Sequence, residues 1–369
     1  MVEHIAGDPI MGLSLGLTAI LLAVLFLPFV SRTVEENLEP FFLVMGITAV
    51  FMNLYYGLID AEALKEVFLE AAEAPVSVSG LPIGITQAVL FFGLLFYFYH
   101  ARIYRSIESA LKRAGFTAFI FIIVLFLGLV SSVISVIVTA VIISELIAAL
   151  KIPREAKVKL AVYACFAVGL GAALTPIGEP LSTIATRKLE APFDFLFRFL
   201  GVYVIPGVVA VAAYTAFSLR RYSRNVEGVS MVYEETLRGV IGRAVRVYMF
   251  VAALELLGKG FTPMVVWYFS KLPSWGLYWL NTISAVVDNA TLTAAEIGPF
   301  LTEEQIRSAL MSLLISGGML IPGNIPNIVA AGKLRIRSGE WARVGVPFGI
   351  ALLIIYFIII EVAGIHVSL

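Results

Sequence analysis

The apolar residues of this chain are gathered into long runs that short charged segments separate. A run of about 20 apolar residues is long enough for a helix that crosses a bilayer. Backbone groups inside lipid must bond to one another, and a helix achieves this within one segment. The pattern predicts an all-α polytopic membrane protein with full-length helices at residues 11–30, 41–59, 82–100, 195–218, 244–270 and 342–364.

Two further apolar stretches, residues 116–150 and 273–300, fall short of the more than about 40 residues that two crossings and a turn require. We therefore predict two re-entrant helical hairpins. Basic residues are typical of cytoplasmic flanks, so the first hairpin should enter from the cytoplasm and turn near residues 131–135. The second should enter from outside. The basic flanks of the first are Arg102, Arg105, Lys112, Arg113, Lys151, Arg154, Lys157 and Lys159.

Two other apolar stretches each contain a pair of prolines, in Thr175-Pro-Ile-Gly-Glu-Pro180 and Ile321-Pro-Gly-Asn-Ile-Pro-Asn327. Proline removes a backbone donor and clashes with the preceding turn, so each helix should break there. The sequence predicts two discontinuous transmembrane helices, at residues 160–189 and 306–334. Carbonyl groups freed at such breaks are typical ligands of transported ions.

The order helix, hairpin, broken helix, helix occurs twice, in residues 82–218 and 244–364, after N-terminal transmembrane helices in residues 1–60. Segments of the two halves align, with residues 131–135 on 284–288 and 174–189 on 320–334. Charge bias gives the halves opposite orientations and places both termini outside. This is an inverted repeat. Residues 60–80, rich in Glu and Ala, are predicted to form an amphipathic segment outside the membrane.

Overall charge and motifs exclude several classes of protein. Lys and Arg number 26, as do Asp and Glu, so there is no basic excess that would favour a nucleic-acid partner. One cysteine allows neither an internal disulfide nor a cysteine-based metal site. Walker and HExxH motifs are absent, which argues against an ATP-driven pump and an HExxH metalloprotease. We expect no enzyme and no cofactor, and the bilayer and small inorganic ions as partners.

Asp288 is the strongest candidate for chemistry, because it falls at the predicted tip of the second hairpin. A carboxylate at the centre of a membrane helix costs about 2.5–3.5 kcal/mol on insertion scales, so it is usually retained for an ion, a proton or an opposite charge. Its alternative role is to cap the second arm of the hairpin. The two roles are compatible.

Oxygen-bearing residues surround both predicted breaks, and hard cations such as sodium prefer oxygen ligands. Glu179 is the second titratable candidate, although it could instead satisfy amide groups at the start of a half-helix. Two glycines at the breaks would let the backbone approach an ion closely. The candidates are Asp288, Asn289, Thr291, Gly323, Asn324 and Asn327 in the second half, and Ser131, Ser135, Thr175, Gly178, Glu179 and Ser182 in the first.

The segments Ser284-Ala-Val-Val-Asp-Asn-Ala-Thr-Leu-Thr-Ala-Ala295 and Gly171-Ala-Ala-Leu-Thr-Pro-Ile-Gly-Glu-Pro180 resemble those of NhaD-type sodium/proton antiporters of the ion transporter superfamily. Within it, the chain is most similar to an uncharacterised prokaryotic family of cation transporters. The resemblance implies hairpins and broken helices that meet at the membrane midplane, a homodimer in the cell membrane, and a sodium and proton site at Asp288, Asn289, Thr175 and Glu179. The first hairpin tip has serines where the dicarboxylate carriers have an Asn-Thr signature.

Three functions remain open from the sequence. A cation/proton antiporter would use Asp288 for both ions, and the transported species would be Na⁺ and H⁺. A sodium-coupled anion symporter would hold a carboxylate or oxyanion at the N-termini of the half-helices. An intramembrane protease built on Asp288 and Glu179 is disfavoured, because such chemistry uses paired aspartates that share a proton.

Overall fold

The computed structural model describes residues 8–31, 33–34, 37–76, 85–225, 228, 236–268, 272–286, 289–298 and 301–363. Every regular element within these residues is helical. Five of the helical segments are long and apolar enough to cross a membrane: Met11–Pro28, Leu38–Tyr55, Phe116–Ile134, Phe195–Ser223 and Ser338–Val362. The prediction of an all-α membrane protein is confirmed at this level.

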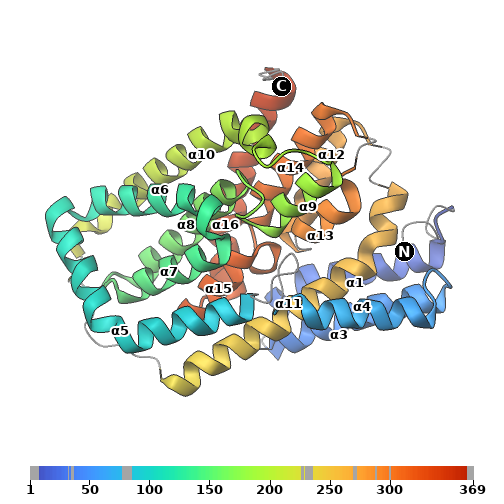
Figure 1. Cartoon of the computed structure of the whole chain (residues 1–369), viewed down its shortest axis with the longest axis horizontal. Coiled ribbons are helices and arrows are strands. Elements are labelled where there is room, and N and C mark those ends of the chain that lie inside the picture. Colours follow the sequence, from blue (N-terminus) through green and yellow to red (C-terminus); the bar gives the residue numbers. More distant parts are fainter. Residues whose placement is uncertain are drawn as a thin grey trace.

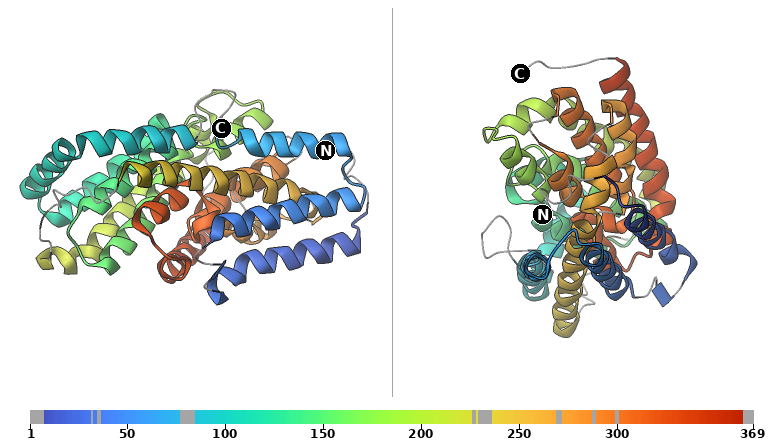
Figure 2. Two further views of the ribbon diagram at one scale, coloured as in Figure 1. Left: turned by 90° about the horizontal axis from the view of Figure 1, so that it is seen from below. Right: turned by 90° about the vertical axis from the view of Figure 1, so that its right-hand side faces the viewer.

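Helices α1 (Met11–Val30) and α3 (Leu38–Tyr55) lie beside the long helix α11 (Leu237–Tyr268), as Figures 1 and 2 show. Small residues allow close packing here, because a Cβ added to Gly260 of α11 would lie against Ala49 of α3. The hydroxyl groups of Ser14 and Tyr268 are 3.1 Å apart. The start of α1 and the end of α11 therefore share one end of the molecule.

Helix α4 (Ala61–Glu73) also lies against α11, in line with the following helix α5 (Figure 2). Lys259 of α11 forms an ion pair with Glu70 and lies 3.9 Å from Glu255, one turn earlier on its own helix. The Tyr248 hydroxyl donates to the Ala72 carbonyl at 3.0 Å. These contacts lay the segment along α11, and its location outside the membrane stays a prediction.

The first half of the remaining chain contains six helices. The second of them ends at Ile134 and the third begins at Val136. Ser135, between them, turns the chain with a φ of 91°. The first helix extends beyond residue 100, where the apolar run ends, because no helix-breaking residue occurs before Gly115. The six are α5 (Ile85–Ala114), α6 (Phe116–Ile134), α7 (Val136–Ala149), α8 (Arg154–Ala172), α9 (Pro180–Lys188) and α10 (Phe195–Leu219).

The second half begins with α11 and contains several shorter pieces. The first arm after α11 is a seven-residue helix that continues as a 3₁₀ segment, rather than one continuous helix. Thr302 and Gln305 form a capping box at the start of α14. The pieces are α12 (Ser274–Leu280), η3 (Asn281–Ala285), α13 (Asn289–Glu296), α14 (Glu303–Gly317), η4 (Ile321–Gly323), α15 (Ile325–Leu334), α16 (Ser338–Phe357) and the π-helical η5 (Ile358–Val362).

The same pairs of elements pack together in the two halves. Helix α7 packs against α15, and α13 packs against α9. Helix α5 contacts α7 just as α11 contacts α13. Helix α8 packs against α6, α7 and α10, and α14 packs against α12, α13 and α16. Both α8 and α14 are buried over most of their length, and the second break is buried as well, whereas Ile177 in the first break is 56 % exposed.

Candidate functional site

The turn of the first helix pair lies directly on the first break. The break separates α8, which ends at Ala172, from α9, which begins at Pro180. The Val136 amide, at the start of α7, donates to the Gly178 carbonyl at 2.7 Å. The Thr175 hydroxyl donates to the Ser132 carbonyl at 2.5 Å. Backbone groups freed by the break are thus shared with the turn.

Glycine is required at two positions of this contact. A Cβ added to Gly178 would clash with the carbonyl group of Ala172. A Cβ added to Gly171 would clash with the carbonyl group of Gly128, where α6 and α8 pack together. Both sites therefore exclude any larger residue without a backbone shift.

A carboxylate and two hydroxyl groups stand at the start of α9. Glu179 is 3 % exposed and directly precedes the helix. The Thr183 hydroxyl donates to the Pro176 carbonyl at 2.5 Å. Ser182 is fully buried, and its hydroxyl has no hydrogen-bond partner among the described residues. This end of the first break is therefore rich in oxygen atoms.

The second break brings carbonyl oxygens of two elements to one glycine. A Cβ added to Gly323 would lie 2.6 Å from the carbonyl oxygens of both Gly317 and Ser284, and 2.9 Å from that of Ala285. Gly317 is the last residue of α14, and the other two oxygens come from the end of η3. Three carbonyl oxygens therefore converge on Gly323.

Side-chain amides complete this region. Asn289, the first residue of α13, is 3 % exposed, and its side-chain nitrogen lies 3.6 Å from the Cβ position of Gly317. That nitrogen has no hydrogen-bond partner among the described residues. The Asn324 nitrogen lies 2.9 Å from the Cβ position of Gly169 on α8. Asp288 and the side chain of Thr291 lie outside the described residues, but Asp288 immediately precedes Asn289.

Three of the sequence candidates bond to the backbone near one or the other break. The Ser131 hydroxyl donates to the carbonyl groups of Gly128 and Val168 at 2.6 and 2.9 Å. The Ser135 hydroxyl accepts from the Ile137 amide at 3.4 Å. The Asn327 side-chain nitrogen donates to the carbonyl groups of Gly317 and Leu320, at 2.8 and 2.7 Å, and so satisfies the end of α14.

Two buried carboxylates outside the predicted set also face partners on other elements. Glu145 of α7 pairs with Lys333 of α15 at 2.7 Å, and their side chains are 0 % and 9 % exposed. Glu296 of α13 accepts from Asn281 of η3 at 3.1 Å. A charged residue within an apolar run is a signal for both carboxylates. Their partners are distant in sequence and became visible only in the fold.

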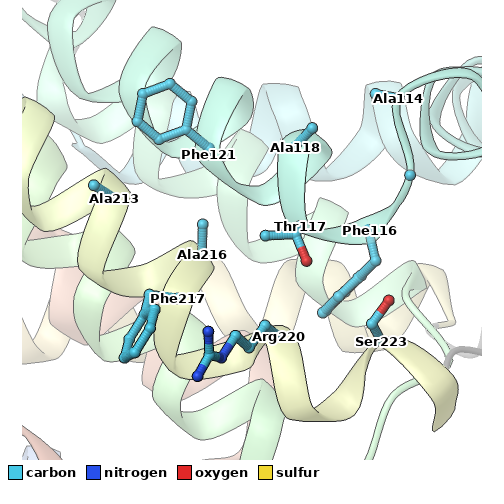
Figure 3. A pocket seen from close by; sticks show the side chains of 11 residues that line it. Ala114, Phe116, Thr117, Ala118, Phe121, Ala213, Ala216, Phe217, Arg220 and Ser223 are labelled. Carbon is cyan, nitrogen blue, oxygen red and sulfur yellow. The ribbon is translucent and has the colours of Figure 1, made fainter.

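Two described cavities differ in their relation to the breaks. Figure 3 shows a pocket of about 690 Å³ that includes Phe116, Phe217 and Arg220, at the end of α6 opposite its turn. Its position makes it unsuitable as the ion site. A cavity of about 10 Å³ between Phe42, Val286 and Pro322 lies beside the second break. It has room for roughly one water molecule.

Gly323→Ala should lower stability and weaken cation binding, because the added methyl group would meet three carbonyl oxygens. Overpacking of this kind costs about 1–3 kcal/mol. Gly332→Ala in α15 is the matched control, since a Cβ there meets no atom within 4 Å. Thermal unfolding in detergent, with and without sodium, measures both effects. Equal behaviour of the two variants would contradict the crowded geometry.

Comparison with known proteins adds a family assignment. No curated protein matches the chain. The family model described as protein of unknown function DUF1646 matches residues 14–363, which include every element from α1 to α16 except the first residues of α1. Because the match extends over nearly all of the chain, the protein belongs to this family.

Proposed function

We propose that the protein is a secondary active transporter that exchanges sodium for protons across the membrane. The observation that carries the proposal is the second break, where three carbonyl oxygens converge on Gly323 beside the buried amide of Asn289. Asp288 immediately precedes Asn289 in the chain and would bring a negative charge to this oxygen-rich region. Unwound backbone carbonyls at broken helices are typical ligands of transported sodium.

In this proposal the two halves form an inverted repeat with re-entrant hairpins. The matching contacts of α7 with α15 and of α13 with α9 support it. Helix α7 has 14 residues and would span about 21 Å, less than a bilayer core of about 30 Å. Helix α6 is long enough to cross. The bond from Val136 to Gly178 supports a turn at the depth of the first break.

Sodium and protons would use the site alternately. Asp288 would bind either one, because a carboxylate within a membrane is more stable once its charge is neutralised. Thr175 and Glu179 would form the corresponding part of the first break. The Glu145–Lys333 pair joins α7 to α15 and would close the path at the end where Arg335 and Arg337 lie. We place this transporter in the cell membrane as a homodimer.

Purified protein in liposomes that contain a pH-sensitive dye tests the function. A sodium gradient should drive protons in the opposite direction. Sodium uptake that requires an added carboxylate or oxyanion, without counter-movement of protons, would instead favour an anion symporter with the half-helix N-termini as its anion site. Failure of both assays would overturn the proposal.

The orientation gives a separate prediction. Single cysteines in place of Ser106 and Arg224 should react only from the cytoplasm, and one in place of Glu303 only from outside. Cys165→Ser is the background, and Cys165 itself is buried. Ser106 and Glu303 are exposed and therefore accessible to reagent. Labelling of both from the same side would contradict the inverted repeat.

A further inference from the structure

Glu296 and Asn281 form a buried polar pair between the two arms of the second helix pair. Glu296 lies at the end of α13 and Asn281 at the start of η3, and they are 3 % and 0 % exposed. The Asn281 Nδ2 atom donates to Glu296 Oε1 at 3.1 Å. The pair therefore joins the end of α13 to the middle of the first arm.

Each partner keeps one atom without a hydrogen bond to any described residue, namely Asn281 Oδ1 and Glu296 Oε2. Both atoms are acceptors when the carboxyl group is ionised. A carboxylate in this place would carry a buried charge with a single N–H donor, which is strongly unfavourable. The two unpaired oxygen atoms therefore lack one hydrogen-bond donor between them.

Two cations on the elements around α13 are engaged elsewhere. The elements packed against α13 are α9, α11, α14 and η3. Lys259 pairs with Glu70, and Arg307 lies over the ring of Phe199 at 4.8 Å. Within the described chain, Asn281 is the hydrogen-bond partner of Glu296. Other charged or titratable residues on those elements include Arg187, Lys188, Glu255, Tyr268, Glu303 and Glu304.

We propose that Glu296 is a proton-binding site, with the proton on Oε2 and donated to Oδ1 of Asn281. A carboxyl group and an amide already joined by one bond can form a second by rotation about their terminal torsions, which are broad. One proton then satisfies both atoms. Release to water returns a carboxylate and a free proton, so the reaction balances without another reagent.

The role of this proton site in transport rests on the proposed exchange of sodium for protons. Asn281 is linked onward, because its carbonyl accepts from the Ser316 hydroxyl at 2.7 Å. Ser316 directly precedes Gly317, whose carbonyl is one of the three at Gly323. Loss of the proton would place a charge between the arms and loosen the helix pair that carries Asn289. Proton release would thus change the proposed cation site.

Infrared difference spectroscopy of the protein in lipid, recorded across pH steps, tests the site directly. The carbonyl stretch of a protonated carboxyl group should titrate in the wild-type protein and be lost in Glu296→Gln. Glutamine should preserve the fold, because it can accept from Nδ2 and donate to Oδ1 of Asn281. Glu304→Gln changes an exposed carboxylate and should retain the full band.

Asn281→Leu provides a second measurement that does not depend on Glu296→Gln. The acid remains but its amide partner is removed, so the band should shift in frequency. A band of unchanged intensity in Glu296→Gln, or one unmoved in Asn281→Leu, would overturn the site. Wild-type protein that shows the Glu296 band but no sodium-driven proton movement in liposomes would refute the transport function and leave the proton site standing.

Discussion

Asp288→Asn should abolish sodium-driven proton movement while leaving the protein folded. Asparagine has the size of aspartate and keeps its capping ability, but it binds no proton in this range of pH and carries no charge for a cation. Because sodium and the proton compete for one carboxylate, lower pH should weaken sodium binding in the wild-type protein. Calorimetric titration with sodium at two pH values should show that dependence in the wild type and lose it in the variant.

Asp60→Asn is the matched control for Asp288→Asn. Asp60 is also an aspartate at the start of a helix, and its carboxylate accepts from the Ala63 amide at 2.8 Å. It lies away from both breaks, so transport and sodium binding should be unchanged. Glu179→Gln should impair transport less than Asp288→Asn if its role is to hold α9. Sodium binding that still depends on pH in Asp288→Asn would assign the shared site to another residue.

Lys333→Met should cause the largest loss of stability. It would leave Glu145 as a buried carboxylate, fully enclosed, without the ammonium group now at 2.7 Å. Breaking a buried ion pair by removal of one partner costs about 3–5 kcal/mol. The apparent melting temperature in detergent should therefore fall well below that of Lys112→Met, which removes an exposed partner of Glu108.

The double variant Glu145→Met/Lys333→Met distinguishes the stability lost with the ion pair from the stability lost by leaving one buried charge without a partner. Replacement of both partners by apolar residues of similar length is often neutral or stabilising, so stability should recover most of its loss. A double variant as unstable as Lys333→Met would show that packing, and not the unpaired carboxylate, dominates. Transport by the double variant tests whether the pair closes one end of the proposed path.

The positions of the helices were predictable because they depend on local sequence. Each long apolar run favours a helix wherever backbone groups lack water, and the prolines at 176, 180, 322 and 326 interrupt it. Helix α8 ends before the first pair and α15 begins between the second. Chain reversal at Ser135 lies at the edge of the range expected for the first turn. Repeats, re-entrant hairpins and transport stay predictions.

The partners across helices were not predictable, because each is fixed by packing between segments distant in sequence. Serine and asparagine at the breaks were predicted to offer oxygen to an ion, and the fold adds that Ser131 and Asn327 also donate to backbone carbonyls of neighbouring segments. The sequence indicates which side chains are polar, but not which groups they contact in the folded protein.

The sequence by itself determined an all-α membrane protein with two proline-interrupted helices, since hydropathy and proline act within one segment. Only the tertiary structure decided that Glu145 meets Lys333 and that Glu296 meets Asn281. It also decided that three carbonyl oxygens converge on Gly323. The physical reason is that a buried charge or a freed carbonyl must find its partner wherever the packed helices place one.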